Sequence, residues 1–190
     1  GDVWICTDHG INFYDRNSHQ MRNFIVYDKS GKYSTAWAYD ILQDQQGRMW
    51  MGSYQGGVFV MDKAALLGGK NIADWHFSDK GKNALSGLHV GQMVMDGKGR
   101  IWASTYNRLD CINPNTMKVV QVANSDVVNY LMADSKGNIW MGDNTSVTCY
   151  YAAGSVLGNS FPSKTWQIGG KVSTMCDVEG KIWVVSGNEC

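Results

Sequence analysis

The chain has 190 residues, of which 44% are hydrophobic and 12% aromatic, so it can fill a sizeable core and disorder is not expected. Lysines and arginines number 17, as do aspartates and glutamates, so no net field draws the chain to nucleic acid or to an anionic membrane. No apolar run approaches the roughly 20 residues of a membrane span, and the N-terminus lacks the basic-then-apolar layout of a signal peptide.

One heptapeptide recurs along the chain: Asp-x-x-Gly, then Arg, Lys or Asn, then Ile or Met, then Trp. Its four copies begin at Asp44, Asp96, Asp134 and Asp177, and a shortened copy at the N-terminus ends at Trp4. The five motif tryptophans are separated by 46, 52, 38 and 43 residues. A unit of roughly 40 to 50 residues with this turn-and-strand signature predicts the blades of a β-propeller.

Each repeat predicts four antiparallel strands, called a to d in chain order. Strand a is apolar on both faces, as suits an inner strand, and is expected at 38–43, 90–95, 128–133 and 172–176. The motif Asp then caps a tight turn that the Gly closes with a positive φ, and strand b follows with the Trp. Strand c alternates in polarity, and strand d is weaker because it is an edge; we expect them at 10–15, 57–62, 108–113 and 146–151, and at 24–27, 75–77, 119–122 and 165–168, respectively.

These strands predict an all-β fold, a β-propeller of four-stranded antiparallel blades. The chain is expected to be a single propeller segment with three blades at 37–88, 89–125 and 126–170, preceded by strands b to d at 1–36 and followed by strands a and b at 171–190. Because this inventory does not close into a ring, we expect a partial arc of a longer propeller whose open ends pair between fragments. The motif tryptophans are expected to lie buried between neighbouring blades, since a sugar-stacking role does not require their fixed place after a turn.

The sequence gives little indication of metal binding or catalysis. The five cysteines form no C-x-x-C pair and have no His at metal-ligand spacing, so we predict no metal site and no cofactor, and we place Cys111 and Cys149 in the core. Only two glutamates occur, Glu179 and Glu189, and four aspartates serve the repeated turns. Without paired carboxylates or a Ser/His/Asp arrangement, we expect no catalysis by this segment.

The motif is followed by Met-Gly or Ala-Ser-Thr, then by Gly-hydrophobic-x-hydrophobic-x-Asp. This pattern resembles the two-component regulator propeller repeat, most fully at 47–57 and 137–142, and the resemblance covers essentially the whole chain. Arg108 and Ser146 stand where the family favours Gly, and the second unit carries an insertion around 63–73. In that family the repeats build the extracytoplasmic sensor of hybrid two-component systems of Bacteroides-type bacteria, followed by a transmembrane helix, a histidine kinase, a receiver and a DNA-binding domain.

The resemblance implies a non-catalytic, periplasmic sensor segment whose input is a glycan-derived oligosaccharide. It also implies a homodimer in which ligand binding shifts the geometry of two propeller-bearing chains. From the balanced charge, we expect no contact of this segment with nucleic acid or membrane. Two alternatives stay open. The chain could be part of a propeller enzyme, of lyase or glycan-cleaving type, with its active loops in other blades, or it could be a protein-interaction scaffold.

In a propeller, the b–c and d–a connections emerge at one end of the channel, and we take that end to bind the ligand. There the sequence places flat aromatics, amides and a guanidinium, which suit sugar faces and hydroxyls. The candidate ligand-binding residues are His9, Trp37, Tyr54, Gln55, Tyr106, Asn107, Arg108 and Asn144, with His89 and Asp126 nearby. For any one of them, a plain solvated loop position stays open as well.

Overall fold

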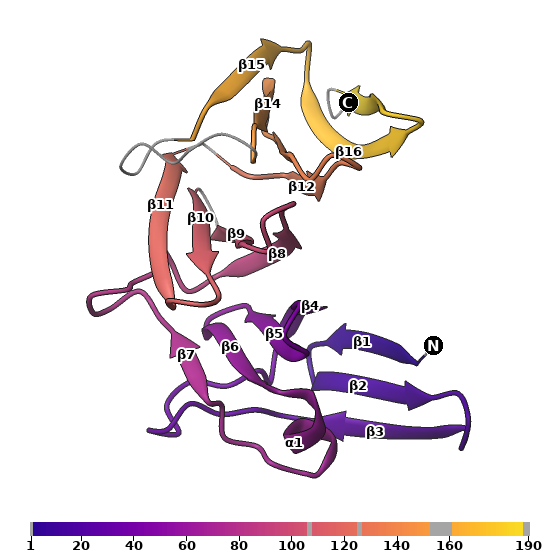
Figure 1. The fold of residues 1–190 in the computed structure, drawn as a ribbon, viewed down its shortest axis with the longest axis vertical. Coiled ribbons are helices and arrows are strands. Elements are labelled where there is room, and N and C mark those ends of the chain that lie inside the picture. The colour runs from indigo at the N-terminus through magenta and orange to yellow at the C-terminus, as the bar shows by residue number, and fades with distance from the viewer. Residues whose placement is uncertain (1, 106–107, 125–126, 153–160, 188–190) are drawn as a thin grey trace. The chain divides into compact units, whose positions relative to one another are not determined.

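The computed structural model describes residues 2–105, 108–124, 127–152 and 161–187 (Figure 1). The chain divides into two compact units, Gly1–Gly91 and Gln92–Cys190. In the described ranges the regular structure is antiparallel β-sheet, apart from one short helix, α1 (Lys63–Leu67). That helix occupies the predicted insertion around 63–73, where the Asp62 side chain accepts the backbone N–H of Ala65 as an N-cap.

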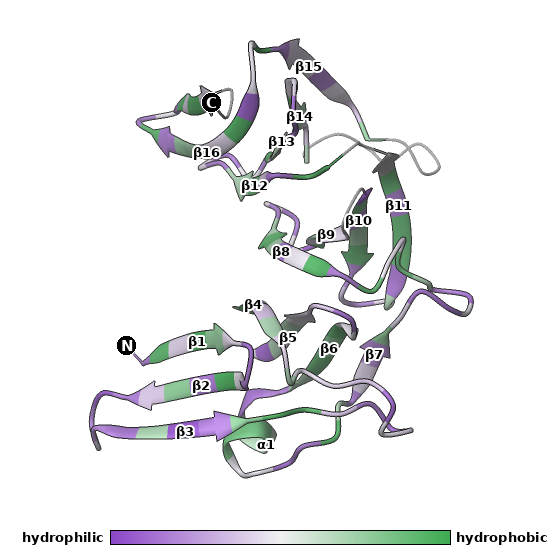
Figure 2. Ribbon diagram, turned by 180° about the vertical axis from the view of Figure 1, so that it is seen from behind, coloured by the Kyte–Doolittle hydropathy of each residue, from purple (hydrophilic) through white to green (hydrophobic). Residues whose placement is uncertain are grey.

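The first unit contains two sheets. One has three strands in the order β1 (Val3–Thr7), β2 (Gly10–Asp15) and β3 (Gln20–Phe24). The other has four strands in the order β4 (Ala38–Gln43), β5 (Arg48–Ser53), β6 (Gly57–Asp62) and β7 (Trp75–Phe77). Figure 2 shows β6 largely hydrophobic and β3 largely hydrophilic, as expected for an inner and an outer strand.

The second unit repeats the four-stranded pattern. Its first sheet consists of β8 (Val90–Met95), which begins just before the unit boundary, β9 (Ile101–Thr105), β10 (Arg108–Asn113) and β11 (Lys118–Asn124). Its second consists of β12 (Tyr130–Ala133), β13 (Ile139–Gly142), β14 (Ser146–Tyr150) and β15 (Ser163–Gln167), and a two-stranded sheet of β16 (Lys171–Val178) and β17 (Lys181–Gly187) follows. The predicted four-stranded antiparallel sheets are confirmed, and the residue bounds of the blades stay a prediction.

Strand d of the first repeat was misplaced. We predicted 24–27, but the strand is β3, which pairs with β2 from Asp15↔Gln20 to Ile11↔Phe24. The chain reverses at once after β2, helped by the positive φ of 55° at His19, so the outer strand begins earlier than its apolar residues suggest. The apolar residues after β3 instead enter the core, where Val26 is completely buried.

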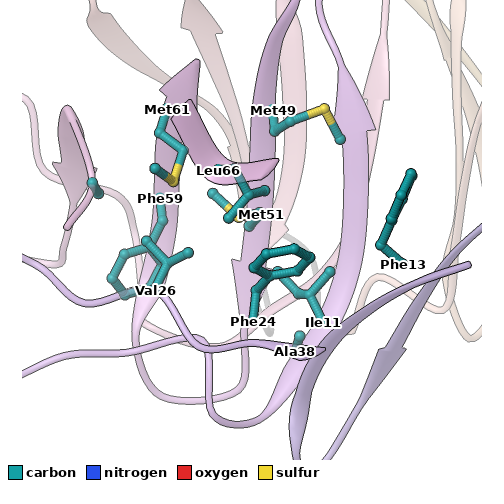
Figure 3. Close-up of a cluster of buried hydrophobic side chains, with 11 residues drawn as sticks. Ile11, Phe13, Phe24, Val26, Ala38, Met49, Met51, Phe59, Met61 and Leu66 are labelled. Carbon is teal, nitrogen blue, oxygen red and sulfur yellow. The ribbon is translucent and has the colours of Figure 1, made fainter. Parts of the chain in front are cut away.

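An apolar cluster joins the two sheets of the first unit (Figure 3). Ile11 and Phe13 come from β2, Met49 and Met51 from β5, and Phe59 from β6. The remaining buried members are Phe24, Val26, Ala38, Met61, Leu66 and Ala73. The sheets therefore pack face to face through their alternating apolar positions, which leaves the loops at the strand ends free to carry a site.

The first three Asp-x-x-Gly turns each have the same pattern of hydrogen bonds. At Asp44, Oδ2 accepts the indole N–H of Trp50 at 2.8 Å and the Nε–H of Arg48 at 2.7 Å, while Oδ1 accepts backbone N–H groups of the turn. The Asp96–Trp102 and Asp134–Trp140 pairs repeat the indole bond at 2.8 and 2.9 Å. The spacing between Asp and Trp therefore lets one carboxylate both close the turn and accept the indole N–H from the next strand.

The fourth copy folds differently, because Glu179 and Gly180 both have positive φ and form a two-residue hairpin loop. Trp183 pairs with Cys176, the residue just before the motif Asp, whereas Trp50 pairs two residues before its Asp.

Ile182 and Val184 of β17 line a hollow that Trp140 also lines, so that face of the strand is covered. Trp183 alternates with them and lies on the opposite face, which no other sheet of the described residues covers. Trp183 is 62% exposed, so the prediction that all five motif tryptophans are buried is wrong there.

The other motif tryptophans are at least partly buried. Trp50 and Trp102 are completely buried, and Trp102 packs between two sheets of the second unit, with ring centroids 5.5 Å from Tyr150 and 4.6 Å from Phe161. The predicted core positions of Cys111 and Cys149 are confirmed as well, since both are buried. Burial raises the pKa of these thiols to about 12 and about 11, so they are not reactive thiolates.

Candidate ligand-binding site

Four ring side chains meet where the β4–β7 sheet ends in its connecting loops. The ring centroids of Trp37 and Tyr54 are 4.6 Å apart, and that of Tyr54 is 4.8 Å from His89. Tyr39 stacks on His89 at 5.3 Å with an interplanar angle of 4°. Trp37 and Tyr39 are 49% and 43% exposed, so the cluster presents aromatic faces to solvent.

A β-bulge places Tyr39 in this cluster. Ala38 pairs with Ser53 and Asp40 pairs with Gly52, so two residues of β4 span one step of β5 and Tyr39 has no cross-strand partner. Such a bulge re-aims a side chain out of the strict alternation of a strand. The strand that supports the core thus also supplies a ring to the surface cluster.

The loop between β5 and β6 carries Tyr54 and Gln55 and is anchored on several sides. The N–H of Tyr54 donates to the carbonyl of Trp37 at 3.0 Å, and the N–H of Gly57 donates to Leu88 O at 2.9 Å. Nε2 of His76 lies 2.6 Å from the carbonyl oxygen of Gly56, which can only accept, so the hydrogen is on Nε2. These bonds hold the loop without using the Tyr54 ring.

The loop between β3 and β4, which leads to Trp37, is fixed by a buried carboxylate. Asp28 accepts the N–H of Tyr33 at 2.8 Å and the N–H and hydroxyl of Ser30 at 3.0 and 2.5 Å. Burial disfavours the charged carboxylate, but these hydrogen bonds outweigh that cost and lower the pKa of Asp28 to about 2. The loop is therefore set by an ionised side chain at neutral pH.

The two loops, together with the loop that follows β7, enclose an open cavity of about 720 Å³. Its walls combine aromatic rings, hydroxyls, an amide and charged groups. They include Lys32, Tyr33, Ser34, Trp37, Ser53, Tyr54, Gln55, Asp79, Lys80 and Leu88. Flat apolar faces beside a few polar groups are the usual lining of a site for a polar small molecule.

The cavity brings together three of the predicted site residues: Trp37, Tyr54 and Gln55. His9 lies elsewhere in the first unit, exposed, with Nδ1 2.9 Å from Asp8 Oδ1. Arg108 and Asn144 belong to the second unit, where both are exposed and the Asn144 side chain accepts from Asn129 at 2.9 Å. The predicted Tyr106 and Asn107 fall outside the described residues, as does Asp126.

The sequence pattern does not mark Lys32, Lys80 or Tyr39 as site residues. Both lysines lie in d–a connections, which we had assigned to the ligand end, but spacing alone does not tell which residues of a long loop reach a cavity. Tyr39 was read as part of an inner strand, and no sequence signal marks its bulge. His89, which we had placed near the site, joins the ring cluster, and burial lowers its pKa, so it is neutral at neutral pH.

A second hollow, of about 360 Å³, lies in the second unit. It is walled by Trp140, Val147, Trp166, Ile168, Gly180, Ile182 and Val184. This lining is almost entirely apolar and offers sugar hydroxyls few partners. In the part of the chain that the structure describes, no three His, Cys, Asp or Glu side chains gather as a metal site.

A family model described as the two-component regulator propeller matches residues 32–55, which run from Lys32 through β4 and β5 to Gln55. The match therefore spans two of the cavity-lining segments. Over 96% of its length, the chain is 30% identical to the extracellular domain of BT4673 from B. thetaiotaomicron, described as a hybrid two-component system, with a TM-score of 0.84. The chain carries the two-component regulator propeller repeat.

Other solved structures share the fold alone. Virginiamycin B lyase from Staphylococcus aureus is 13% identical, with a TM-score of 0.69 over 98% of this chain and 60% of the lyase. The WD40 β-propeller domain of Doa1 is 12% identical, with a TM-score of 0.65 over 98% of this chain and 57% of that domain. The predicted propeller fold is thus confirmed. No curated protein matches the chain.

The chain covers 25% of the BT4673 extracellular domain. Within the described residues, no helix is long and apolar enough to span a membrane. The similar domain from B. thetaiotaomicron is described as extracellular.

Proposed function

We propose that the chain is a ligand-sensing segment of the periplasmic sensor of a hybrid two-component system and that its cavity binds a glycan-derived oligosaccharide. The observation that carries the proposal is the half-exposed ring of Trp37, 4.6 Å from Tyr54, at the wall of the 720 Å³ cavity. Aromatic faces stack on the C–H faces of sugars, while the nearby Ser and Gln side chains offer donors and acceptors to hydroxyls.

The similarity to an extracellular two-component domain at 30% identity supports the sensor part of the proposal. Kinase control, dimerisation and passage of the signal through a change in dimer geometry belong to the proposal as well, because the chain covers only a quarter of that domain. Binding itself is the step that this chain can perform with the residues it contains.

The lining argues for binding rather than cleavage. Asp79 is the one carboxylate among the described residues that wall the cavity, whereas glycoside hydrolysis uses a pair of carboxyl groups. The cavity is open to solvent, so we expect an affinity of about 1 mM for a trisaccharide, near −4 kcal/mol.

Titration of the 190-residue chain with neutral trisaccharides, followed by tryptophan fluorescence and calorimetry, tests the proposal. Trp37→Ala should abolish binding. Trp75→Ala is the matched control, because Trp75 is 46% exposed in the same unit but lies outside the cavity. Equal loss in both variants, or no binding of any saccharide by the unaltered chain, would overturn the proposal, and product formation would favour a propeller enzyme.

A further inference from the structure

Two lysine side chains wall the same cavity from different loops. Lys32 lies between β3 and β4, and Lys80 lies between β7 and β8. The ammonium of Lys32 sits 4.9 Å from the centroid of the Tyr33 ring, a cation–π contact within the lining. The positive groups therefore flank the wall that carries the aromatic platform of Trp37 and Tyr54.

In the described part of the chain, neither ammonium group has a carboxylate partner. Among the described residues, Lys32 and Lys80 form no ion pair, whereas Arg48, Arg100 and Lys70 each pair with an aspartate. Asp79 is the only acid in the described lining, so the cavity carries about one net positive charge in a chain whose formal net charge is zero. The nearby His89 adds none, because its pKa is lowered and its ring is neutral at neutral pH.

We propose that this cavity selects an oligosaccharide with an anionic substituent, a uronate carboxylate or a sulfate ester, and that Lys32 and Lys80 contact that substituent. The proposal rests on the proposed function and adds the charge of the ligand to it. An ammonium is a compact cation with three donors and accepts either kind of oxyanion. The rings of Trp37 and Tyr54 pack against the sugar, and the lysine ammonium groups contact its anionic substituent.

The size of the effect follows from the exposure of the lysines. An exposed ion pair changes an equilibrium by about twofold to fivefold at low salt. With two lysines, we expect an acidic trisaccharide to bind about threefold to tenfold tighter than its neutral counterpart. Salt should remove most of this preference, because at about 1 M the screening length is only ~3 Å.

The test compares three probes on the 190-residue chain at low and high salt: trigalacturonate, galactotriose and a monosulfated galactotriose. The unaltered chain should prefer the charged probes. The double variant Lys32→Gln, Lys80→Gln should lose the preference and keep its affinity for galactotriose. The matched control is Lys29→Gln, Lys82→Gln, which removes the same charge from the same two loops at exposed positions outside the cavity lining and should keep the preference.

The outcomes separate the two proposals. If galactotriose binds through Trp37 but the charged probes bind no tighter, the anionic ligand is ruled out and the sugar site stands. If the preference survives in the Lys32, Lys80 variant, these lysines are not its source. If none of the three probes binds, both proposals fail. Tighter binding of one charged probe than of the other identifies the substituent as carboxylate or sulfate.

Discussion

The indole N–H of Trp50 donates to Oδ2 of Asp44 at 2.8 Å, across a turn in which the same carboxylate also accepts from Arg48. Burial disfavours the charge on Asp44, but the bonds from Trp50 and Arg48 outweigh this and lower the pKa of the carboxyl below its usual range. One acidic residue thus ties turn, strand and core together, which explains why Asp and Trp recur at a fixed spacing.

Replacing Asp44 with Ala should destabilise the chain by about 3 kcal/mol, because a buried indole N–H and a partly buried guanidinium lose a charged acceptor. Urea unfolding followed by circular dichroism measures the loss. Asp177→Ala is the control, since Asp177 occupies the same motif position but accepts from the backbone of Ser135 and Gly180. Asp177→Ala should lose less unfolding free energy than Asp44→Ala. Equal losses would contradict the stabilising role of the Asp44–Trp50–Arg48 hydrogen bonds.

Stability should fall in acid as Asp28 is protonated. Its pKa is about 2 in the folded chain and 3.8 in the reference state, so its contribution is fully present above pH 3.8 and is lost as the pH falls towards 2. Unfolding free energies across this range measure the slope. Asp28→Asn should be less stable at neutral pH and should have a shallower slope between pH 4 and 2. An unchanged slope would contradict the anchoring role of this carboxylate.

Much of the fold can be predicted from the sequence, because strands a to c are tied to a repeating turn motif. The binding site is harder to predict from the sequence. Tyr54 and Gln55 follow a motif tryptophan at fixed spacing and were found, whereas Tyr39 depends on a bulge and Lys80 on the course of a long loop. The exposure of Trp183 depends on whether another sheet covers its face of β17, which the shared motif does not reveal.

His76 should support binding without touching the ligand. Its ring packs between Tyr33 and Phe59, at 5.1 and 4.6 Å, and bonds to the carbonyl of Gly56. His76→Phe keeps the packing and removes the bond, so sugar affinity should fall about threefold as the loop loosens. His19→Phe, which removes a side chain bonded to Tyr14, should leave affinity unchanged. Equal affinities of the His76 variant and the unaltered chain would exclude this positioning role.

Gly57 has a φ of +80°, and a Cβ there would collide with the carbonyl oxygen of Phe77. Gly57→Ala should therefore cost about 3 kcal/mol, from backbone strain together with displacement of β7. Gly81→Ala tests strain alone, because Gly81 also has a positive φ of +94° but no atom lies within 4 Å of the added Cβ. Gly81→Ala should lower the unfolding free energy by about 1 kcal/mol. Thermal unfolding of the two variants distinguishes these costs.

The most direct test of the sugar site is an ¹⁵N-resolved NMR spectrum of the indole N–H groups during titration with trigalacturonate and galactotriose. The chain has 8 tryptophans, each with one indole signal. We predict that the Trp37 signal shifts with ligand concentration while those of the exposed Trp75 and Trp183 do not. A shift at Trp183 alone, or no shift at Trp37 when a ligand is bound, would contradict the assignment of the cavity as the ligand-binding site.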